Sequence, residues 1–157
     1  MAQTNPSIEY RVKAIFLFNF TRFIDWPDSS FGTKDAPLVI GIIGEDPFGA
    51  YLDETVAGEK CGTHSILIQH YTEVTEINSC HILYINLSDP AQIKTILNTL
   101  AGRSILTVND NPDFPRWGGM VRFFTENNKL RLQINAATTK AAQLNISSKL
   151  LGVAQIF

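Results

Sequence analysis

The sequence has few of the features that mark membrane proteins, nucleotide-binding proteins and metalloenzymes. No stretch approaches the roughly 18 consecutive apolar residues that a membrane-spanning helix requires. Neither the GxGxxG nor the GxxxxGK(S/T) spacing of phosphate-binding loops occurs, and no serine stands in a GxSxG turn. His64, His70 and His81 lack the HxxxH spacing of a zinc site, so we expect them to be core or surface residues. The sequence therefore predicts no cofactor, no metal and no catalytic activity.

Cysteine is also scarce, because Cys61 and Cys80 are the only two. They lack CxxC spacing, and two thiols alone do not complete a zinc site. A flavodoxin-like strand order would put them on strands at either side of the first strand, roughly 10 Å apart, whereas a disulfide needs Cα atoms within about 7 Å. We therefore expect two free thiols and no disulfide.

The net charge is only −2, which argues against recruitment of nucleic acid by a global field. The distribution is uneven. Residues 1–113 carry 7 basic and 14 acidic groups, net −7, whereas residues 114–157 carry 6 basic and 1 acidic group, net +5. The basic C-terminal part is either an ordinary solvated surface or a face for an acidic partner or a membrane surface.

The length of 157 residues, with 45% hydrophobic residues, predicts one globular domain. We assign residues 1–7 to an N-terminal tail and residues 8–157 to the domain. Continuously apolar runs predict buried strands at 38–44, 65–71, 81–86 and 104–109. Helical patterns follow Asn5-Pro6 and recur at 47–57, 73–78, 90–101 and 136–144. This alternation predicts an α/β domain with a mostly parallel sheet flanked by helices on both faces.

The stretch MVRFFTENNKLRLQIN predicts a C-terminal antiparallel hairpin that turns at Asn127-Asn128, since asparagine tolerates positive φ. A two-residue loop pairs Thr125 with Leu130, Phe123 with Leu132 and Val121 with Ile134 on one apolar face. The opposite face carries Met120, Arg122, Phe124, Arg131 and Gln133. Such a mixture of aromatic residues, methionine and arginine is typical of protein interfaces; alternatively, a neighbouring helix covers this face and the arginines reach outward to solvent.

The stretch GIIGEDPFG, residues 41–49, ends a predicted strand at a place where nucleotide-binding proteins hold a phosphate. Glu45 and Asp46 would repel an anion there. We expect a structural role instead, in which Asp46 caps the next helix, Pro47 begins it and Gly44 lets the chain turn.

The loop NDNPDFPRWGG, residues 109–119, lies at the carboxyl edge of the predicted sheet, where α/β folds bind ligands. Asp110 and Asp113 could act as paired carboxylates, but Asx-Pro turns use the same residues for backbone hydrogen bonds, which we favour. Trp117 beside the Gly-Gly turn is a candidate contact point. A ligand at this edge would lie near Gly44, Asn86, Asp110, Asp113 and Trp117.

Seven stretches together resemble the YfiR-like family of small periplasmic proteins in order and approximate spacing. They are VKAIFLFNFTRFIDWP, PLVIGIIGEDPFG, SCHILYIN, ILTVND, GGMVRFF, LRLQIN and ISSKLLGVAQIF. The resemblance covers residues 8–157 and implies the same α/β fold.

The resemblance also implies a function. The best-understood members restrain a membrane-bound diguanylate cyclase by binding its periplasmic region, and an outer-membrane lipoprotein can sequester the restraint. By this resemblance we expect a non-enzymatic periplasmic regulator, from which a signal peptide has been removed, acting as a homodimer. The best-known member carries a disulfide from its first strand to the position of Cys80. The strand at 38–44 has no cysteine here, so redox control of that kind is not expected.

Three functional hypotheses follow. The leading one is regulation by protein–protein contact, through Trp117, Met120, Arg122, Phe124, Arg131 and Gln133. The second is a small-molecule sensor with its ligand at the carboxyl edge of the sheet. The third is a hydrolase that uses Asp110 and Asp113.

Overall fold

The computed structural model describes residues 7–157, and the first helix begins at their start. Ser7 is the N-cap of α1 (Ile8–Phe23), and its hydroxyl accepts a hydrogen bond from the backbone N–H of Tyr10 at 3.4 Å. The predicted cap at Asn5-Pro6 lies outside the described residues.

Strands form at all four predicted places, and helices form within three of the four later predicted ranges, but the helix predicted at 73–78 is only a 3₁₀ turn. The helices are α2 (Tyr51–Val56), α3 (Pro90–Leu100), α4 (Ala136–Ala141) and α5 (Ser148–Leu151), with 3₁₀ turns η1 (Asp28–Ser30) and η2 (Val74–Glu76). The first five strands are β1 (Ile24–Asp25), β2 (Leu38–Gly44), β3 (Lys60–Cys61), β4 (His64–Tyr71) and β5 (Ile82–Asn86). The last five are β6 (Leu106–Asn109), β7 (Val121–Glu126), β8 (Lys129–Ile134), β9 (Asn145–Ile146) and β10 (Gln155–Ile156).

Eight strands form the central sheet, in the order β10-β8-β7-β6-β5-β2-β4-β3, while β1 and β9 pair separately. The strands from β4 through β2, β5 and β6 to β7 are mutually parallel. This is the flavodoxin-like order, in which the chain reverses its direction of winding between β2 and β5. Ligands of such sheets bind at the carboxyl ends of the strands beside that reversal.

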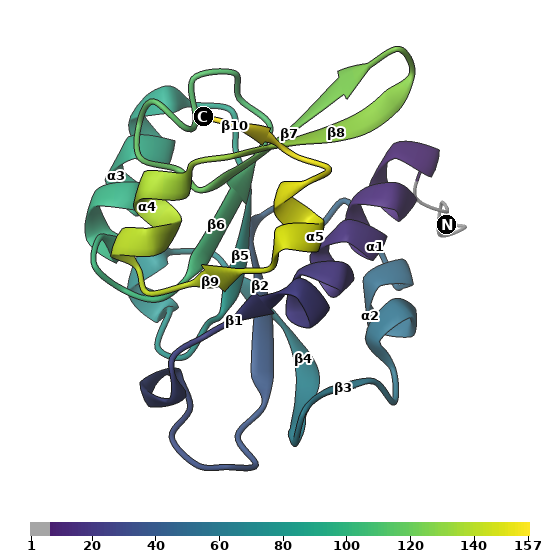
Figure 1. Cartoon of the computed structure of the whole chain (residues 1–157), viewed down its shortest axis with the longest axis vertical. Coiled ribbons are helices and arrows are strands. Elements are labelled where there is room, and N and C mark those ends of the chain that lie inside the picture. Colours follow the sequence, from purple (N-terminus) through teal and green to yellow (C-terminus); the bar gives the residue numbers. More distant parts are fainter. Residues whose placement is uncertain (1–6) are drawn as a thin grey trace.

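The sheet separates two hydrophobic cores, and helices cover both of its faces (Figure 1). The larger core packs α1, α2 and α5 against one face through residues such as Leu17, Phe20 and Leu52. The smaller core packs α3 against the other face through Ile93 and Ile96. The fold is therefore the predicted α/β domain with a mostly parallel sheet, helices on both faces and a C-terminal hairpin.

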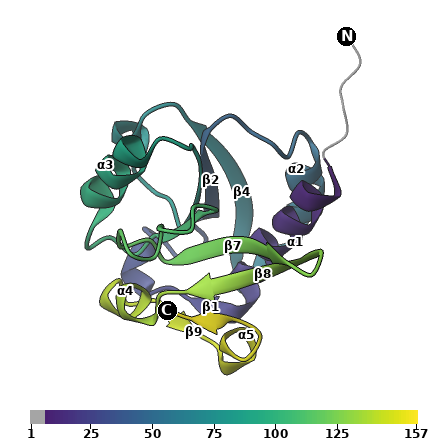
Figure 2. The ribbon, with the colours of Figure 1, turned by 90° about the horizontal axis from the view of Figure 1, so that it is seen from above.

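The hairpin of β7 and β8 has the predicted register. Val121 pairs with Ile134, Phe123 with Leu132 and Thr125 with Leu130. Asn127 and Asn128 adopt φ values of 52° and 63°, as a two-residue turn that fits the twist of a hairpin requires. The tip of the hairpin projects beyond the rest of the sheet, on the side of α1 (Figure 2).

The predicted helix at 47–57 is shorter in the structure and begins only at Tyr51. Asp46 does not cap it, because its Oδ1 accepts the backbone N–H of Phe48 at 2.8 Å and its Oδ2 lies 2.7 Å from Nε2 of His70. These contacts hold a tight turn before the helix, so the predicted roles of Asp46 and Pro47 are wrong. The predicted role of Gly44 is confirmed, since its φ is +97°.

Cys61 and Cys80 are free thiols in the structure. Cys61 lies on β3 and packs against the larger core, whereas Cys80 precedes β5 in the smaller core, with β4 and β2 between them. Burial raises the pKa of Cys80 to about 12, so its thiol stays protonated.

Candidate functional site

The solvent side of the hairpin is the first candidate site, and we call it the outer hairpin face. Strand pairing sets Arg122 beside Gln133 and Phe124 beside Arg131. The guanidinium of Arg122 lies over the ring of Phe124, 4.7 Å from its centroid, and donates to Oε1 of Gln133 at 3.1 Å. These four predicted residues therefore lie together, with Arg131 exposed and the others half-buried.

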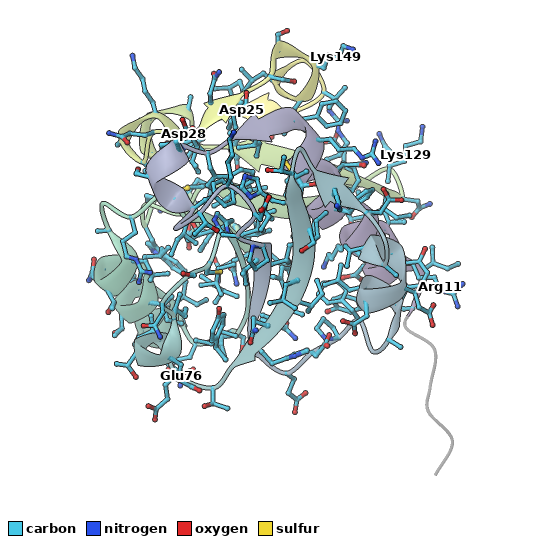
Figure 3. The ribbon with its side chains drawn as sticks, turned by 90° about the horizontal axis from the view of Figure 1, so that it is seen from below. Arg11, Asp25, Asp28, Glu76, Lys129 and Lys149 are labelled. Carbon is cyan, nitrogen blue, oxygen red and sulfur yellow. The ribbon has the colours of Figure 1, made fainter. Side chains whose placement is uncertain are left out.

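Pairing of Glu126 with Lys129 extends the outer hairpin face toward the tip, and neither residue was predicted to belong to it. Arg131 donates from Nη1 to Oε1 of Glu126 at 3.1 Å. Lys129, labelled in Figure 3, stands at the edge of the molecule on the same side as Arg11. The outer hairpin face thus carries three cations and one carboxylate. The signal that could have identified Glu126 and Lys129 is the strand alternation itself, continued to the turn.

Two of the predicted partner-binding residues lie elsewhere. Met120 is buried, with 8% exposure, and packs in the larger core together with Ala142, at the end of α4. Its predicted place on an open face is wrong, because Thr138 and Ala141 of α4 lie on the same side of the sheet beside it. Trp117 packs against the smaller core, with Nζ of Lys94 from α3 lying 5.1 Å from its ring centroid. It belongs to the surroundings of α3 and not to the outer hairpin face.

The second candidate site is a cavity of about 790 Å³ at the carboxyl ends of β2, β5 and β6. Figure 2 looks onto this edge of the sheet. Its lining includes three of the residues that sequence reasoning predicted there, namely Gly44, Asn86 and Asp110. Asp113 and Trp117 are not among the lining residues; Trp117 instead lines a separate hollow of about 270 Å³ beside α3.

A buried lysine lies beside this cavity and was not predicted. Lys13 of α1 is 2% exposed, and its Nζ forms ion pairs with Glu9 at 2.6 Å and with Asp110. Its ammonium also lies 4.7 Å from the ring centroid of Tyr10. Burial alone would lower the pKa of Lys13, but the hydrogen bonds to Asp110 and Glu9 outweigh this effect and raise its pKa above the ordinary value. Lys13 is therefore a cation at neutral pH.

Asp110 is held by two groups at once. Its Oδ2 pairs with Lys13, and its Oδ1 accepts a hydrogen bond from the hydroxyl of Tyr84 at 3.3 Å. Burial and the negative charge of Asp110 raise the pKa of Tyr84, which keeps the phenol protonated as a donor. Asp113 instead pairs with Arg116 at 3.2 Å. The two carboxylates bond to different groups and do not form the shared pair that the hydrolase hypothesis requires.

Residues 7–157 contain no group of three or more histidine, cysteine or acidic side chains placed to hold a metal ion. His64 and His81 both stack on the ring of Phe31, with 3.7 Å and 4.4 Å between the ring centroids. His81 is buried, with its Nδ1 accepting the backbone N–H of Val39 at 2.9 Å, whereas His70 is exposed and pairs with Asp46. Within the same described residues, no helix has both the length and the apolar character needed to cross a membrane.

A comparison with curated proteins finds no significant match. A family model described as YfiR/HmsC-like matches residues 10–155, nearly the whole chain. This family is regulatory, is not a known enzyme family, and is associated with periplasmic regulators of cyclic di-GMP signalling. The matched segment contains every strand of the central sheet except the last residue of β10, as well as both candidate sites. The chain therefore belongs to the YfiR/HmsC-like family.

Proposed function

We propose that the protein acts in the periplasm and restrains a membrane-bound diguanylate cyclase, or a similar membrane sensor, by binding its periplasmic region. Family membership supports the regulatory role, and the outer hairpin face supports the mode of action. A regulator that works by contact needs a solvent-accessible surface with a few strong anchor residues rather than a reaction centre.

The observation that carries this proposal is the arginine–phenylalanine pair at the centre of the outer hairpin face. Arg122 and Phe124 stack with 4.7 Å between the guanidinium carbon and the ring centroid. Tyrosine, tryptophan and arginine dominate the energetics of protein interfaces, and aromatic residues in general are enriched there. The Nε of Arg122 is buried and has no hydrogen-bond partner among the described residues, which is a costly state for a donor. A partner that drew the guanidinium outward and supplied an acceptor would remove that cost.

The charge of the outer hairpin face indicates the kind of partner. Arg122, Lys129 and Arg131 give it a positive charge that Glu126 offsets only in part, in a chain whose net charge is −2. A partner surface with exposed carboxylates would be attracted to this region and oriented on it. Regulation of the partner in turn requires that the protein bind its active and inactive states with different affinity.

The protein offers a matched control pair on α1. Arg22 lies over the ring of Phe18 at 4.8 Å and pairs with Glu59 at 3.3 Å, much as Arg122 stacks on Phe124 and Arg131 pairs with Glu126. Phe18→Ala and Arg22→Glu therefore make the same chemical changes on α1 that Phe124→Ala and Arg131→Glu make on the outer hairpin face.

A cellular experiment tests the function. The protein is exported to the periplasm of cells that express the membrane cyclase encoded nearest to its gene, and cyclic di-GMP is measured. We expect a lower level with the wild-type protein and with Phe18→Ala, and an unrestrained level with Phe124→Ala. An equal effect of Phe18→Ala and Phe124→Ala would place the working surface elsewhere.

Two further partners belong to this proposal. An outer-membrane lipoprotein would compete for the protein and release the cyclase, and a second copy of the chain would form a homodimer. Addition of a periplasmic lipoprotein domain to the purified complex tests the first, since release of the cyclase region is expected. Sedimentation velocity tests the second, because a monomer at all concentrations would exclude the homodimer.

A further inference from the structure

We propose that the cavity at the carboxyl edge of the sheet binds a small, uncharged or cationic organic molecule that is rich in hydrogen-bond donors, such as a hydroxylated or amine-bearing compound. The cavity measures about 790 Å³, within the size range of sites that hold metabolite-sized ligands. It lies where the winding of the sheet reverses between β2 and β5, which is the place that this strand order leaves open for a ligand.

The walls of the cavity are fixed before any ligand arrives. Asn109 is 3% exposed, and its amide donates to the backbone oxygens of Ile85 at 2.8 Å and Leu87 at 3.3 Å. Asn86 donates to the backbone oxygen of Glu45 at 2.7 Å, which ties the end of β5 to the end of β2. Because these bonds hold the ends of the strands in one geometry, binding would cost little reorganisation of the protein.

The lining is rich in hydrogen-bond acceptors and contains no cation. It includes three carboxylates (Glu45, Asp89 and Asp110) and the hydroxyls of Thr72 and Ser88. Besides Asn86 and Asn109, it also includes the side-chain amides of Gln92 and Asn111. Among the described residues no lysine or arginine lines it, and Lys13, which pairs with the lining residue Asp110 and with Glu9, is buried. Such a lining attracts hydroxyl and ammonium donors and repels phosphate or carboxylate groups.

The ligand site is separate from the outer hairpin face. None of Arg122, Phe124, Arg131 and Gln133 is among the residues that line the cavity. Ligand binding at the cavity can therefore be tested independently of partner binding at the outer hairpin face.

Titration of the isotopically labelled protein, followed by the backbone amide signals of Gly44, Asn86 and Asn111, tests this inference. The probes are glucosamine, glucose, spermidine and glucose 6-phosphate, each to about 10 mM, a range that detects dissociation constants in the millimolar range. We expect glucosamine to shift these signals at concentrations at least roughly tenfold lower than glucose 6-phosphate. Binding of glucose as well would identify hydroxyl recognition, and binding of spermidine instead would identify amine recognition.

A matched pair of charge reversals completes the experiment. Glu45→Lys places a cation at the cavity and is expected to weaken glucosamine binding roughly tenfold, by adding like-charge repulsion. Glu54→Lys makes the same change at an exposed position of α2 that does not line the cavity, and glucosamine binding is expected to stay within about twofold of wild type. Equal binding of glucose 6-phosphate and glucosamine, or no shift with any probe, would overturn the inference.

Discussion

The ammonium of Lys13, in the first helix, pairs with the carboxylate of Asp110, at the carboxyl end of β6, although 97 residues separate them in the sequence. Lys13 is 2% exposed, so its ammonium group has lost most of its hydration and depends on a few protein groups to stabilise its charge. The pair joins α1 to the edge of the sheet. Asp110 lines the cavity, and the ring of Phe123, on the buried side of β7, lies 5.9 Å from Nζ of Lys13.

Asp110→Asn is expected to lower the free energy of unfolding by about 2 kcal/mol, because it weakens a hydrogen bond to a buried charged group. The ion pair of Lys13 with Glu9 remains and limits the loss. Asp113→Asn is the matched control, since Asp113 pairs with an arginine on the surface, and it is expected to change stability by less than about 0.5 kcal/mol. Urea titrations of wild type and the two variants measure both changes. Equal losses of unfolding free energy would mean that the pair with Lys13 stabilises the fold no more than a surface ion pair does.

Acidification is expected to destabilise the protein through His81. Burial lowers its pKa, nearby His64 lowers it further, and the hydrogen bond to the backbone oxygen of Ser30 opposes both. Because Nδ1 accepts the N–H of Val39, the folded state holds the neutral ring. As the pH falls below about 6.5, the unfolded chain binds a proton that the folded protein excludes, so stability decreases until the pH reaches the folded pKa.

A comparison of wild type with His81→Asn isolates this effect. The variant is expected to be less stable at pH 7.5, since a buried residue and its hydrogen bonds are lost, but to lose less stability than wild type between pH 7 and pH 5. Carboxylates contribute equally to both proteins and cancel in the difference. Parallel curves of unfolding free energy against pH for the two proteins would contradict this assignment.

Gly44→Ala is expected to cost about 2 kcal/mol or more, because strain at a positive φ is added to a steric overlap. The φ of Gly44 is +97°, and a Cβ there would lie 2.4 Å from the backbone oxygen of Asn86. Gly58 is the control: its φ is +73°, but a Cβ would meet nothing within 4 Å. Gly58→Ala is therefore expected to cost only about 1 kcal/mol, and thermal unfolding of both variants would reveal whether the close approach of β2 to β5 matters beyond φ alone.

Local patterns in the sequence were sufficient to predict the fold and the hairpin. The alternation of apolar residues from Val121 to Ile134 fixes which side chains face the core, and Asn127-Asn128 supplies a turn of matching length. The same reasoning placed Arg122, Phe124, Arg131 and Gln133 on one face. It gave no information about what lies above that face, so it could not exclude Met120, which is buried beside α4.

The buried parts of the candidate sites could not be read from local patterns. Lys13 stands within an apolar helix at a position that a sequence reading assigns to a lysine reaching solvent, and only its distant partner Asp110 explains its burial. Asp46 shows the same limit. Its position predicts a helix cap, but the contact with His70, 24 residues later, belongs to a turn before the helix. Pairings between distant residues decide these cases, and one sequence without its structure does not contain them.

The central claim, that a partner docks on the outer hairpin face, is tested most directly by a binding titration with the purified periplasmic region of the neighbouring cyclase. The proteins compared are wild type, Phe124→Ala and Arg131→Glu, with Phe18→Ala and Arg22→Glu as matched controls. Loss of an anchor residue costs about 2 kcal/mol or more, so each outer-face variant is expected to bind at least roughly 30-fold more weakly. Both controls are expected to bind within about twofold of wild type. Thermal unfolding of all the compared proteins checks that each variant is folded. Wild-type affinity in folded Phe124→Ala and Arg131→Glu would contradict the account.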